Sequence, residues 1–425
     1  MLSPLIWHMN KKIICFAALT GAALLLSSCK PLEILNNILD DVKPENAALT
    51  SAVKEHRQSL TGYGYNALKT EAERNAYATV DYLAQRGEDT VFMLDNDGTP
   101  AKMGDIIDLY KGDHPEVFWL DDSGGYEYTK HDTYTEIRLL YTFTGEDLIE
   151  ARKQFSDRVE EILEEAPKDK SKYEKELWLN DMLVENCEYD EEAAEEDEVV
   201  SNEQNAYGAL VDGKVVCEGY TRAFQLLCSK MDIPCVSVNG TAENAAAGGD
   251  GNHIWNAVQL DDEWYYVDVT WNDFQPNSDE YQLTEIEKHL YFNITTDKLL
   301  EDHKISPLYG SEEETDYYNA FIPECTAKEY NFFHKSLITI SSAKDSGKLQ
   351  KALTKAAADN AESFAFCIDE DADYEEVVDD IINGNAYSWI KKANEKNDDK
   401  HQLSYNSKFF TYEEINAAAF VLEYE

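Results

Sequence analysis

Apolar positions in the first half of the chain follow two periods, which predict a mixture of helices and strands. Apolar residues three and four apart, the helical spacing, predict helices over 69–86, 145–167 and 171–187. Alternating or β-rich segments predict strands at 90–94, 116–120 and 135–143. We therefore expect a polar tether over 30–68, a small α+β region over 69–143, and a further domain over 144–310.

A second apolar stripe lies in the segment VVCEGYTRAFQLLC, and it predicts a buried helix that begins near Cys217. The stripe consists of Tyr220, Ala223, Phe224, Leu227 and Cys228. Alternation then predicts strands at 234–240, 253–260 and 263–271. The predicted architecture is one helix packed on an antiparallel sheet, in an α+β fold.

The end of the chain, 326–425, has a different rhythm. Two helical patterns, at 344–358 and near 373–392, alternate with short β-rich segments and predict a β-α-β-α-β-β unit. None of its residues forms a recognisable catalytic pattern, so we expect this small α/β domain to serve packing or contact with a partner.

Cys217 stands where the helix begins, and this position favours reactivity. The first amide N–H groups of a helix have no partner within it, and the helix dipole places partial positive charge there. A thiol at such a point is biased toward the nucleophilic thiolate. A buried cysteine is also a common small core residue, so a base is needed to distinguish the two interpretations.

The two strands after the helix supply such a base. If Asp261 and Asp262 form a two-residue hairpin turn, residue i faces residue 523 minus i, and His253 and Asp268 become diagonal neighbours on one face. His253 would then exchange a proton with Cys217, and Asp268 would orient the imidazole. The backbone N–H of Cys217 is the expected first oxyanion donor, and the sequence identifies no second one.

Other residues near these motifs are weaker candidates. His289 and His303 are competitors for the role of base, although neither has a comparable context. Trp255 and Tyr220 are weak candidates for substrate contact, and packing in the core is the alternative for both. His253, taken alone, is also typical of a strand histidine with a structural hydrogen bond.

The N-terminal segment 1–29 has the pattern of a secretory signal. Lys11 and Lys12 precede an uncharged run from Ile13 to Leu26, which ends in Leu-Ser-Ser-Cys. This ending resembles the bacterial lipobox, and the resemblance implies that Cys29 becomes a lipid-modified first residue. We expect a protein of the bacterial cell envelope, anchored by its lipid and facing away from the cytoplasm.

Charge and cysteine usage exclude several other classes of protein. Beyond residue 29 the chain carries 35 basic and 84 acidic side chains, a formal charge of −49 that argues against nucleic acid as a partner. Six cysteines remain there without regular spacing or a CxxC pair, so no zinc site or disulfide framework is predicted. We expect no cofactor and no metal.

Three motifs in order resemble the bacterial transglutaminase-like proteins of the papain-like cysteine superfamily. They are V-C-E-G-Y-x-x-A-F, H-x-W-N-x-V and W-Y-x-V-D-x-T-W, and they contain Cys217, His253 and Asp268. The resemblance implies a nucleophile helix packed on an antiparallel sheet and acyl transfer through a thioester on protein or peptide amides. It leaves open cross-linking, peptide hydrolysis, cleavage of cell-wall peptides, and a non-catalytic adhesion or assembly module that keeps the fold. No residues match a calcium site.

Overall fold

The computed structural model describes residues 47–121, 125–195, 202–244, 249–273, 284–342, 346–397 and 401–424. The predicted signal segment and Cys29 lie outside these residues. All of the described residues belong to one compact unit that begins at Pro44. None of the helices in these ranges is both long enough and apolar enough to cross a membrane.

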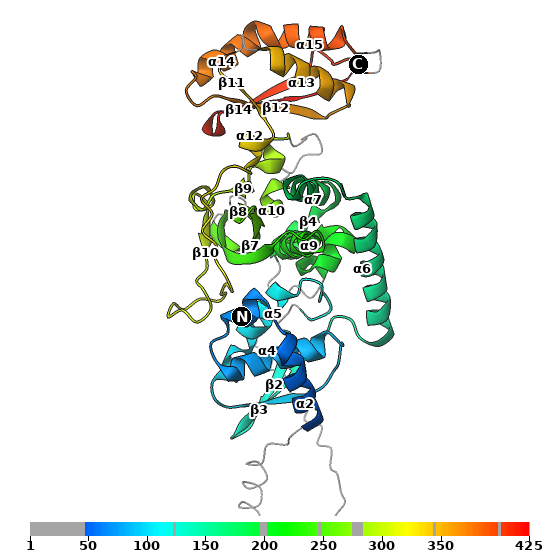
Figure 1. Cartoon of the computed structure of the whole chain (residues 1–425), viewed down its shortest axis with the longest axis vertical. Helices are drawn as coiled ribbons and strands as arrows, with labels where there is room; N and C mark the ends of the chain where they lie inside the picture. The colour runs from blue at the N-terminus through cyan, green and yellow to red at the C-terminus, as the bar shows by residue number, and fades with distance from the viewer. Residues whose placement is uncertain are drawn as a thin grey trace, which may run out of the picture. The chain divides into compact units, whose positions relative to one another are not determined.

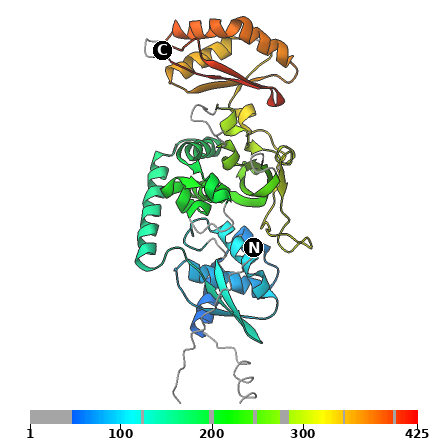
Figure 2. The ribbon, with the colours of Figure 1, turned by 180° about the vertical axis from the view of Figure 1, so that it is seen from behind.

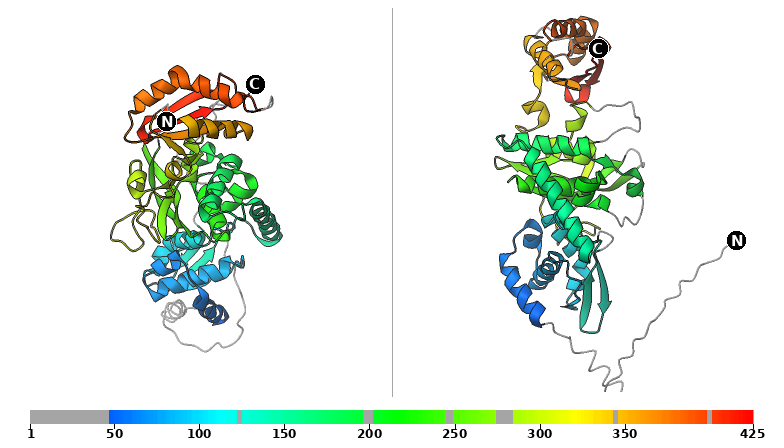
Figure 3. Two further views of the ribbon diagram at one scale, coloured as in Figure 1. Left: turned by 45° about the horizontal axis from the view of Figure 1, so that its top comes forward. Right: turned by 90° about the vertical axis from the view of Figure 1, so that its right-hand side faces the viewer.

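The first described region combines four helices with a three-stranded antiparallel sheet of order β1-β3-β2. Its helices are α2 (Ala47–His56), α3 (Tyr63–Ala67), α4 (Glu71–Ala84) and α5 (Met103–Asp113). Its strands are β1 (Phe92–Asp95), β2 (Tyr126–Lys130) and β3 (Tyr134–Leu139). The hairpin of β2 and β3 is seen from the side in the right-hand view of Figure 3.

Two sequence predictions for this region are wrong. Residues 47–67, which we expected in a polar tether, are largely helical, and Val53 and Leu68 are buried. Residues 116–120 form turns with a single bridge from Leu120 to Tyr141, not a strand. Residues 117–120 are all buried in the core. Their large apolar side chains, which are also common in strands, therefore serve packing here.

The middle region packs helices against a five-stranded antiparallel sheet of order β10-β6-β7-β8-β9. Its helices are α6 (Gly145–Glu165), α7 (Lys172–Asn186), α8 (Glu191–Glu195), α9 (Cys217–Lys230), α10 (Val269–Asn272) and α11 (Thr296–Leu299). The sheet strands are β6 (Cys235–Asn244), β7 (Gly249–Leu260), β8 (Glu263–Val267), β9 (Phe292–Ile294) and β10 (His303–Ile305). A separate short pair joins β4 (Glu188–Tyr189) to β5 (Lys214–Val215). Helices α7 and α9 lie between this sheet and α6 (Figures 1 and 2).

The predicted hairpin register is confirmed along β7 and β8. Leu260 pairs with Glu263 and Asn256 with Val267, so residue i faces residue 523 minus i. Asp261 and Asp262 both have positive φ, as a tight two-residue hairpin turn requires. The strand ends at Val267, however, so the expected extension to 271 is wrong, and Asp268 begins the short helix α10 instead.

The last region has the predicted order of elements. Its sheet, of order β11-β12-β14-β13, consists of β11 (Ile338–Ile340), β12 (Ser363–Ile368), β14 (Ala417–Val421) and β13 (Lys408–Tyr412). Helices α13 (Ser346–Ala358), α14 (Tyr374–Asp380) and α15 (Ala386–Asn394) cover one face of this sheet (Figure 1). The short helix α12 (Phe332–Lys335) precedes β11.

Candidate active site

Helix α9 carries Cys217 as its first residue, and the rest of the helix is fixed in the core. The five residues of the predicted apolar stripe are buried, and so is every other residue from Gly219 to Cys228, including the polar Arg222 and Gln225. Val216, the residue before the helix, has an extended backbone, and its side chain accepts no hydrogen bond from the amide N–H groups of the first turn. Cys217 itself stays partly exposed. The thiol therefore sits on a rigid support and keeps access to solvent.

Gly219 allows the chain before α9 to pass close to the helix. A Cβ atom at this position would lie 2.5 Å from Cβ of Val215 and 2.6 Å from the backbone oxygen of Glu203. Side-chain carbons do not approach other atoms that closely, so only glycine fits. The glycine thus fixes the path of the backbone that delivers Cys217.

His253 on β7 and Asp268 at the start of α10 form the predicted pair. The Nε2 atom of His253 lies 2.6 Å from Oδ2 of Asp268, and the two side chains are 8% and 1% exposed. The other oxygen, Oδ1, accepts a hydrogen bond from the backbone N–H of Trp271 at 3.1 Å and so caps α10. Asp268 is therefore oriented by its own helix and not by a strand pair.

Neighbouring charges keep His253 protonated and Asp268 ionised. Burial by itself lowers the pKa of His253, but the Asp268 carboxylate outweighs it, and a hydrogen bond with the Cys217 thiol adds to the effect. Together they raise the pKa of His253 to about 10. For Asp268 burial raises the pKa, but the imidazoles of His253 and His303 hold it well below its usual range. His253 therefore carries a proton at neutral pH.

The contact of His253 with Asp268 defines which imidazole nitrogen remains for the Cys217 thiol. Since Nε2 of His253 is bound to Asp268, Nδ1 is the nitrogen left to interact with the sulfur. The three predicted residues, from three separate segments, thus meet in one cluster. This arrangement can move a proton between a thiol and a leaving group while the carboxylate keeps the ring oriented.

A second imidazole, that of His303 on β10, binds the same carboxylate. Its Nε2 atom lies 3.1 Å from Oδ2 of Asp268, and its side chain is fully buried. Its Nδ1 atom lies 2.5 Å from Oδ1 of Asp302, whose other oxygen accepts a hydrogen bond from the Tyr291 hydroxyl. From its sequence context His303 is only a competing candidate for the base, and the pairing of β10 with β6 is what brings it to Asp268.

His253, Asp268 and His303 form the one group of three potential metal ligands among the described residues, with ligand atoms within 4.8 Å of one another. The distances of 2.6 and 3.1 Å to the shared carboxylate oxygen are those of direct hydrogen bonds. The three residues therefore form a hydrogen-bonded cluster, in which each imidazole Nε2 atom is already paired with the carboxylate oxygen.

Tyr189 of β4 is a further residue of the site that the sequence analysis missed. It pairs with Val215, two residues before Cys217. Burial, and then the charges of Cys217 and Asp268, raise the pKa of Tyr189, so its hydroxyl keeps its proton. The Tyr189 hydroxyl is therefore a protonated O–H donor within the electrostatic range of Cys217.

The two weak candidates for substrate contact are core residues. Trp255 is 1% exposed and Tyr220 is 0% exposed. The Tyr220 hydroxyl donates to Asp273, and the Trp255 ring stacks on His253 with centroids 5.8 Å apart. We therefore assign neither residue a contact with substrate. His289 also lies away from the thiol, because its ring binds Asp181 and the Glu285 backbone.

The first described region contacts the middle of α9. The amide of Gln225 donates to the backbone oxygen of Gly112, at the end of α5, at 2.6 Å. One turn earlier on α9, Arg222 forms an ion pair with Glu218 at 2.8 Å. Residues outside the nucleophile domain thus help to fix the helix that carries Cys217.

The remaining cysteines differ from Cys217 in environment. Burial raises the pKa of Cys187 and Cys325 to about 12 and that of Cys367 to about 11, and it raises the pKa of Cys228 well above its usual range. Cys235, like Cys217, is partly exposed, and all six described cysteines are free. Among the described cysteines, Cys217 is the one that lies beside a histidine with a raised pKa, His253.

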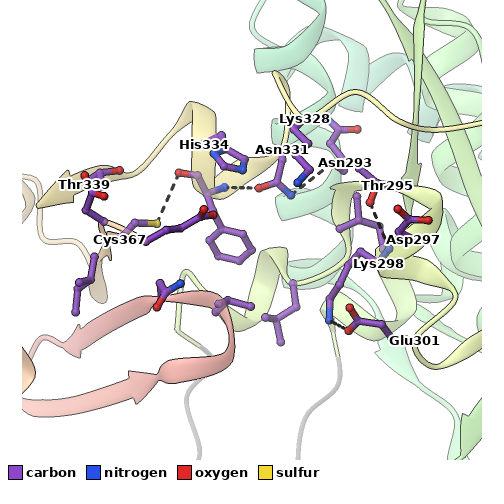
Figure 4. Close-up of a pocket in the computed structure, with 18 of the residues that line it drawn as sticks. Asn293, Thr295, Asp297, Lys298, Glu301, Lys328, Asn331, His334, Thr339 and Cys367 are labelled. Atoms are coloured by element: carbon purple, nitrogen blue, oxygen red, sulfur yellow. Dashed lines mark hydrogen bonds and ion pairs between the residues drawn. The ribbon is translucent and has the colours of Figure 1, made fainter. Parts of the chain in front are cut away.

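A cavity of about 650 Å³ lies elsewhere, between the segments around β9 and α12 and the edge of the last sheet (Figure 4). Asn331, Lys298 and Asp369 are among its lining residues, and Cys367 donates to the backbone oxygen of Phe333 beside it. None of the three predicted catalytic residues lines this cavity. It is therefore separate from the cluster around Cys217.

Comparisons with known proteins agree with the motifs. Residues 158–269 match the family described as the Transglutaminase-like superfamily. Kyphoscoliosis peptidases of Mus musculus and Homo sapiens are each 26% identical to the chain over 164 residues, which is 36% of this chain and 24% of each relative. The chain thus spans about a quarter of the length of the curated relatives it matches.

A solved structure described as a TGase is also similar, with 15% identity over 47% of this chain and 55% of that chain and a TM-score of 0.28. The family match shows that the chain carries a transglutaminase-like domain. The predicted α+β fold class is confirmed by this match together with the mixed helices and antiparallel sheet.

Proposed function

We propose that the chain is a thiol-dependent acyl-transfer enzyme that acts on amide bonds of proteins or peptides. The observation that carries the proposal is the cluster itself. A partly exposed thiol at a helix start lies beside an imidazole that is held, at 2.6 Å, by a buried carboxylate. The transglutaminase-like domain match supports the same class of chemistry.

In the proposed reaction the Cys217 thiolate attacks the carbonyl carbon of an amide. The C–N bond breaks, a C–S bond forms, and the His253 imidazolium gives its proton to the leaving amine. An amine or a water molecule then attacks the thioester and loses its proton to His253, and the C–S bond breaks to return the thiolate. Asp268 keeps its negative charge throughout and stabilises the imidazolium.

Negative charge develops on the carbonyl oxygen during each attack, and two donors would stabilise it. The backbone N–H of Cys217 is the first donor, because it lies at the start of a helix. We assign the second role to the Tyr189 hydroxyl, which keeps its proton and lies within the electrostatic range of Cys217. Two donors of this kind are the arrangement that acyl transfer requires.

We also propose that the protein acts at the bacterial cell envelope, anchored through Cys29. This part rests on the sequence of segment 1–29, where the basic end, the apolar run and Leu-Ser-Ser-Cys occur in order. Globomycin-type inhibition of lipoprotein processing provides its test. Loss of processing of the wild type, and insensitivity of a Cys29→Ala variant, would support the anchor, and unchanged processing of the wild type would exclude it.

The activity is tested with the purified full chain, a mixture of proteins and a fluorescent primary amine. Incorporation of the amine would identify transfer, and new peptide N-termini without incorporation would identify hydrolysis. Either product must disappear in the Cys217→Ser variant. Absence of both products, together with an unreactive Cys217, would support a non-catalytic adhesion or assembly module instead.

A further inference from the structure

One carboxylate oxygen serves two imidazoles in the proposed site. Oδ2 of Asp268 lies 2.6 Å from Nε2 of His253 and 3.1 Å from Nε2 of His303. The cysteine mechanism described above needs only the first of these contacts. The second histidine is fully buried, so it is held in place to make this contact and has no access to substrate.

The sheet is built to let His303 reach the carboxylate. His303 stands on the edge strand β10 and pairs with Ala242 of β6, and two residues along the same face Ile305 pairs with Gly240. Gly240 in turn pairs with His253 on β7. The strand between the two histidines thus presents only small residues on their shared face. A larger side chain at Ala242 would occupy the space that the imidazole crosses.

Both ends of the His303 ring are bound to carboxylates. Nδ1 binds Asp302 at 2.5 Å, and Asp302 also receives a hydrogen bond from the Tyr291 hydroxyl. Burial lowers the pKa of His303, but the hydrogen bonds to Asp268 and Asp302 outweigh it and raise the pKa. The positive charge of His253 opposes this rise. His303 therefore donates an N–H from each nitrogen.

The rings of His253 and His303 lie with centroids 5.5 Å apart, so each influences the other's charge. The contact with His303 prevents Asp268 from turning away from His253, so the carboxylate stays where it stabilises the imidazolium beside the thiol.

We propose that His303 is a positioning residue that fixes the Asp268 carboxylate against the catalytic imidazole and shares its charge. The inference rests on the proposed function, because it assigns His303 a role through His253. His303 keeps its own proton through the cycle, so no atom or charge is added to the reaction. The chain of contacts runs from Tyr291 through Asp302 and His303 to Asp268.

The test compares two substitutions of His303 in the full chain. His303→Gln keeps an N–H donor at a similar reach from the backbone, whereas His303→Ala removes it. The readout is the rate of iodoacetamide alkylation of Cys217 at about pH 6.5, where free thiols react slowly, divided by the folded fraction of each variant. His289→Gln is the matched control, because it removes another buried histidine that binds a carboxylate outside the cluster.

We expect His303→Ala to slow alkylation per folded molecule by about tenfold or more, and His303→Gln to stay within about threefold of the wild type. His289→Gln should alkylate at the wild-type rate. Equal rates for the wild type and His303→Ala would overturn the inference and leave His303 with a structural role. A wild-type Cys217 that fails to react selectively would instead contradict the proposed function, so the two failures are distinguishable.

Nitrogen-15 NMR of the histidine rings gives a second readout that needs no turnover. At about pH 7.5, where an unperturbed histidine is mostly neutral, His303 should show two protonated nitrogens. A neutral His303 ring at this pH would overturn the shared-charge part of the inference. The assignment comes from the signal that disappears in His303→Gln.

Discussion

Replacing Asp268 with asparagine removes one charge from the centre of the proposed site and leaves its shape nearly unchanged. The asparagine oxygen can still cap α10 by accepting from the Trp271 N–H, which lies 3.1 Å from Oδ1. The oxygen that accepts from His253 and His303, at 2.6 and 3.1 Å, is replaced by an amide NH2 group, which donates and carries no charge. The change therefore removes the charge and the acceptor but keeps the side-chain shape.

The expected effect on stability is large, because Asp268 is 1% exposed. Breaking a buried charge pair costs roughly 3–5 kcal/mol. Since the cap on α10 survives, we expect about 2–4 kcal/mol less free energy of unfolding at neutral pH. The effect on turnover should be greater, about 10³- to 10⁴-fold, because the imidazole loses the partner that fixes its tautomer.

The pH dependence of this loss follows from the pKa of His253. Because that pKa is raised from 6.5 to about 10, the stabilisation from Asp268 is fully present below pH 6.5 and is lost as pH rises through about 10. The difference in unfolding free energy between the wild type and Asp268→Asn should therefore narrow between these values. Denaturant titrations monitored by tryptophan fluorescence across this range would measure it.

Asp273→Asn is the control for this experiment. Asp273 is buried one helical turn after Asp268 and accepts a hydrogen bond from Tyr220 instead of a histidine. Its substitution should lower stability but not remove the proton relay. The reasoning would be refuted if Asp268→Asn kept turnover within about tenfold of the wild type, or if its stability deficit did not change with pH.

Three further substitutions test other parts of the account. Gly219→Ala places a carbon within 2.6 Å of Val215 and Glu203 and should cost about 1–3 kcal/mol in denaturant unfolding; an unchanged unfolding midpoint would contradict the packing. Burial raises the pKa of Glu176 from 4.5 to about 8, so folded-state stability should fall as pH rises between these values. In Glu176→Gln, melting temperatures over this pH window should lack that fall, and its persistence would exclude this residue as the cause. Tyr189→Phe should lower turnover about 10²-fold without slowing alkylation of the nucleophile, and unchanged turnover would exclude its role as an oxyanion donor.

The local part of the site could be predicted from sequence, because it depends on periodicity. The apolar stripe located helix α9 and its first residue, Cys217. The two aspartates of the hairpin turn defined the register of β7 and β8. Asp268 was predicted as a strand residue, but it caps α10, and the contact with His253 survives because the backbone changes direction only after Val267.

The missed parts depend on contacts that no local pattern encodes. His303 reaches Asp268 only because β10 pairs with β6 across some sixty residues of sequence. Tyr189 approaches the thiol through a two-residue parallel pair that is too short to show a period. Helix α5 was not predicted, because Gly104 and Gly112 stand near its two ends and lower its helix propensity. Residues 116–120 have strand composition but are buried as turns.

Selective alkylation of Cys217 is the most direct test of the proposed ion pair. The full chain is treated with iodoacetamide at a series of pH values, and the labelled cysteines are mapped by mass spectrometry. Cys235, which is also partly exposed, provides the internal comparison within the same molecule. We predict that Cys217 is labelled at about pH 6.5, well before Cys235, and that His253→Ala abolishes this preference. Equal labelling of the two thiols, or a preference that survives in His253→Ala, would contradict the account.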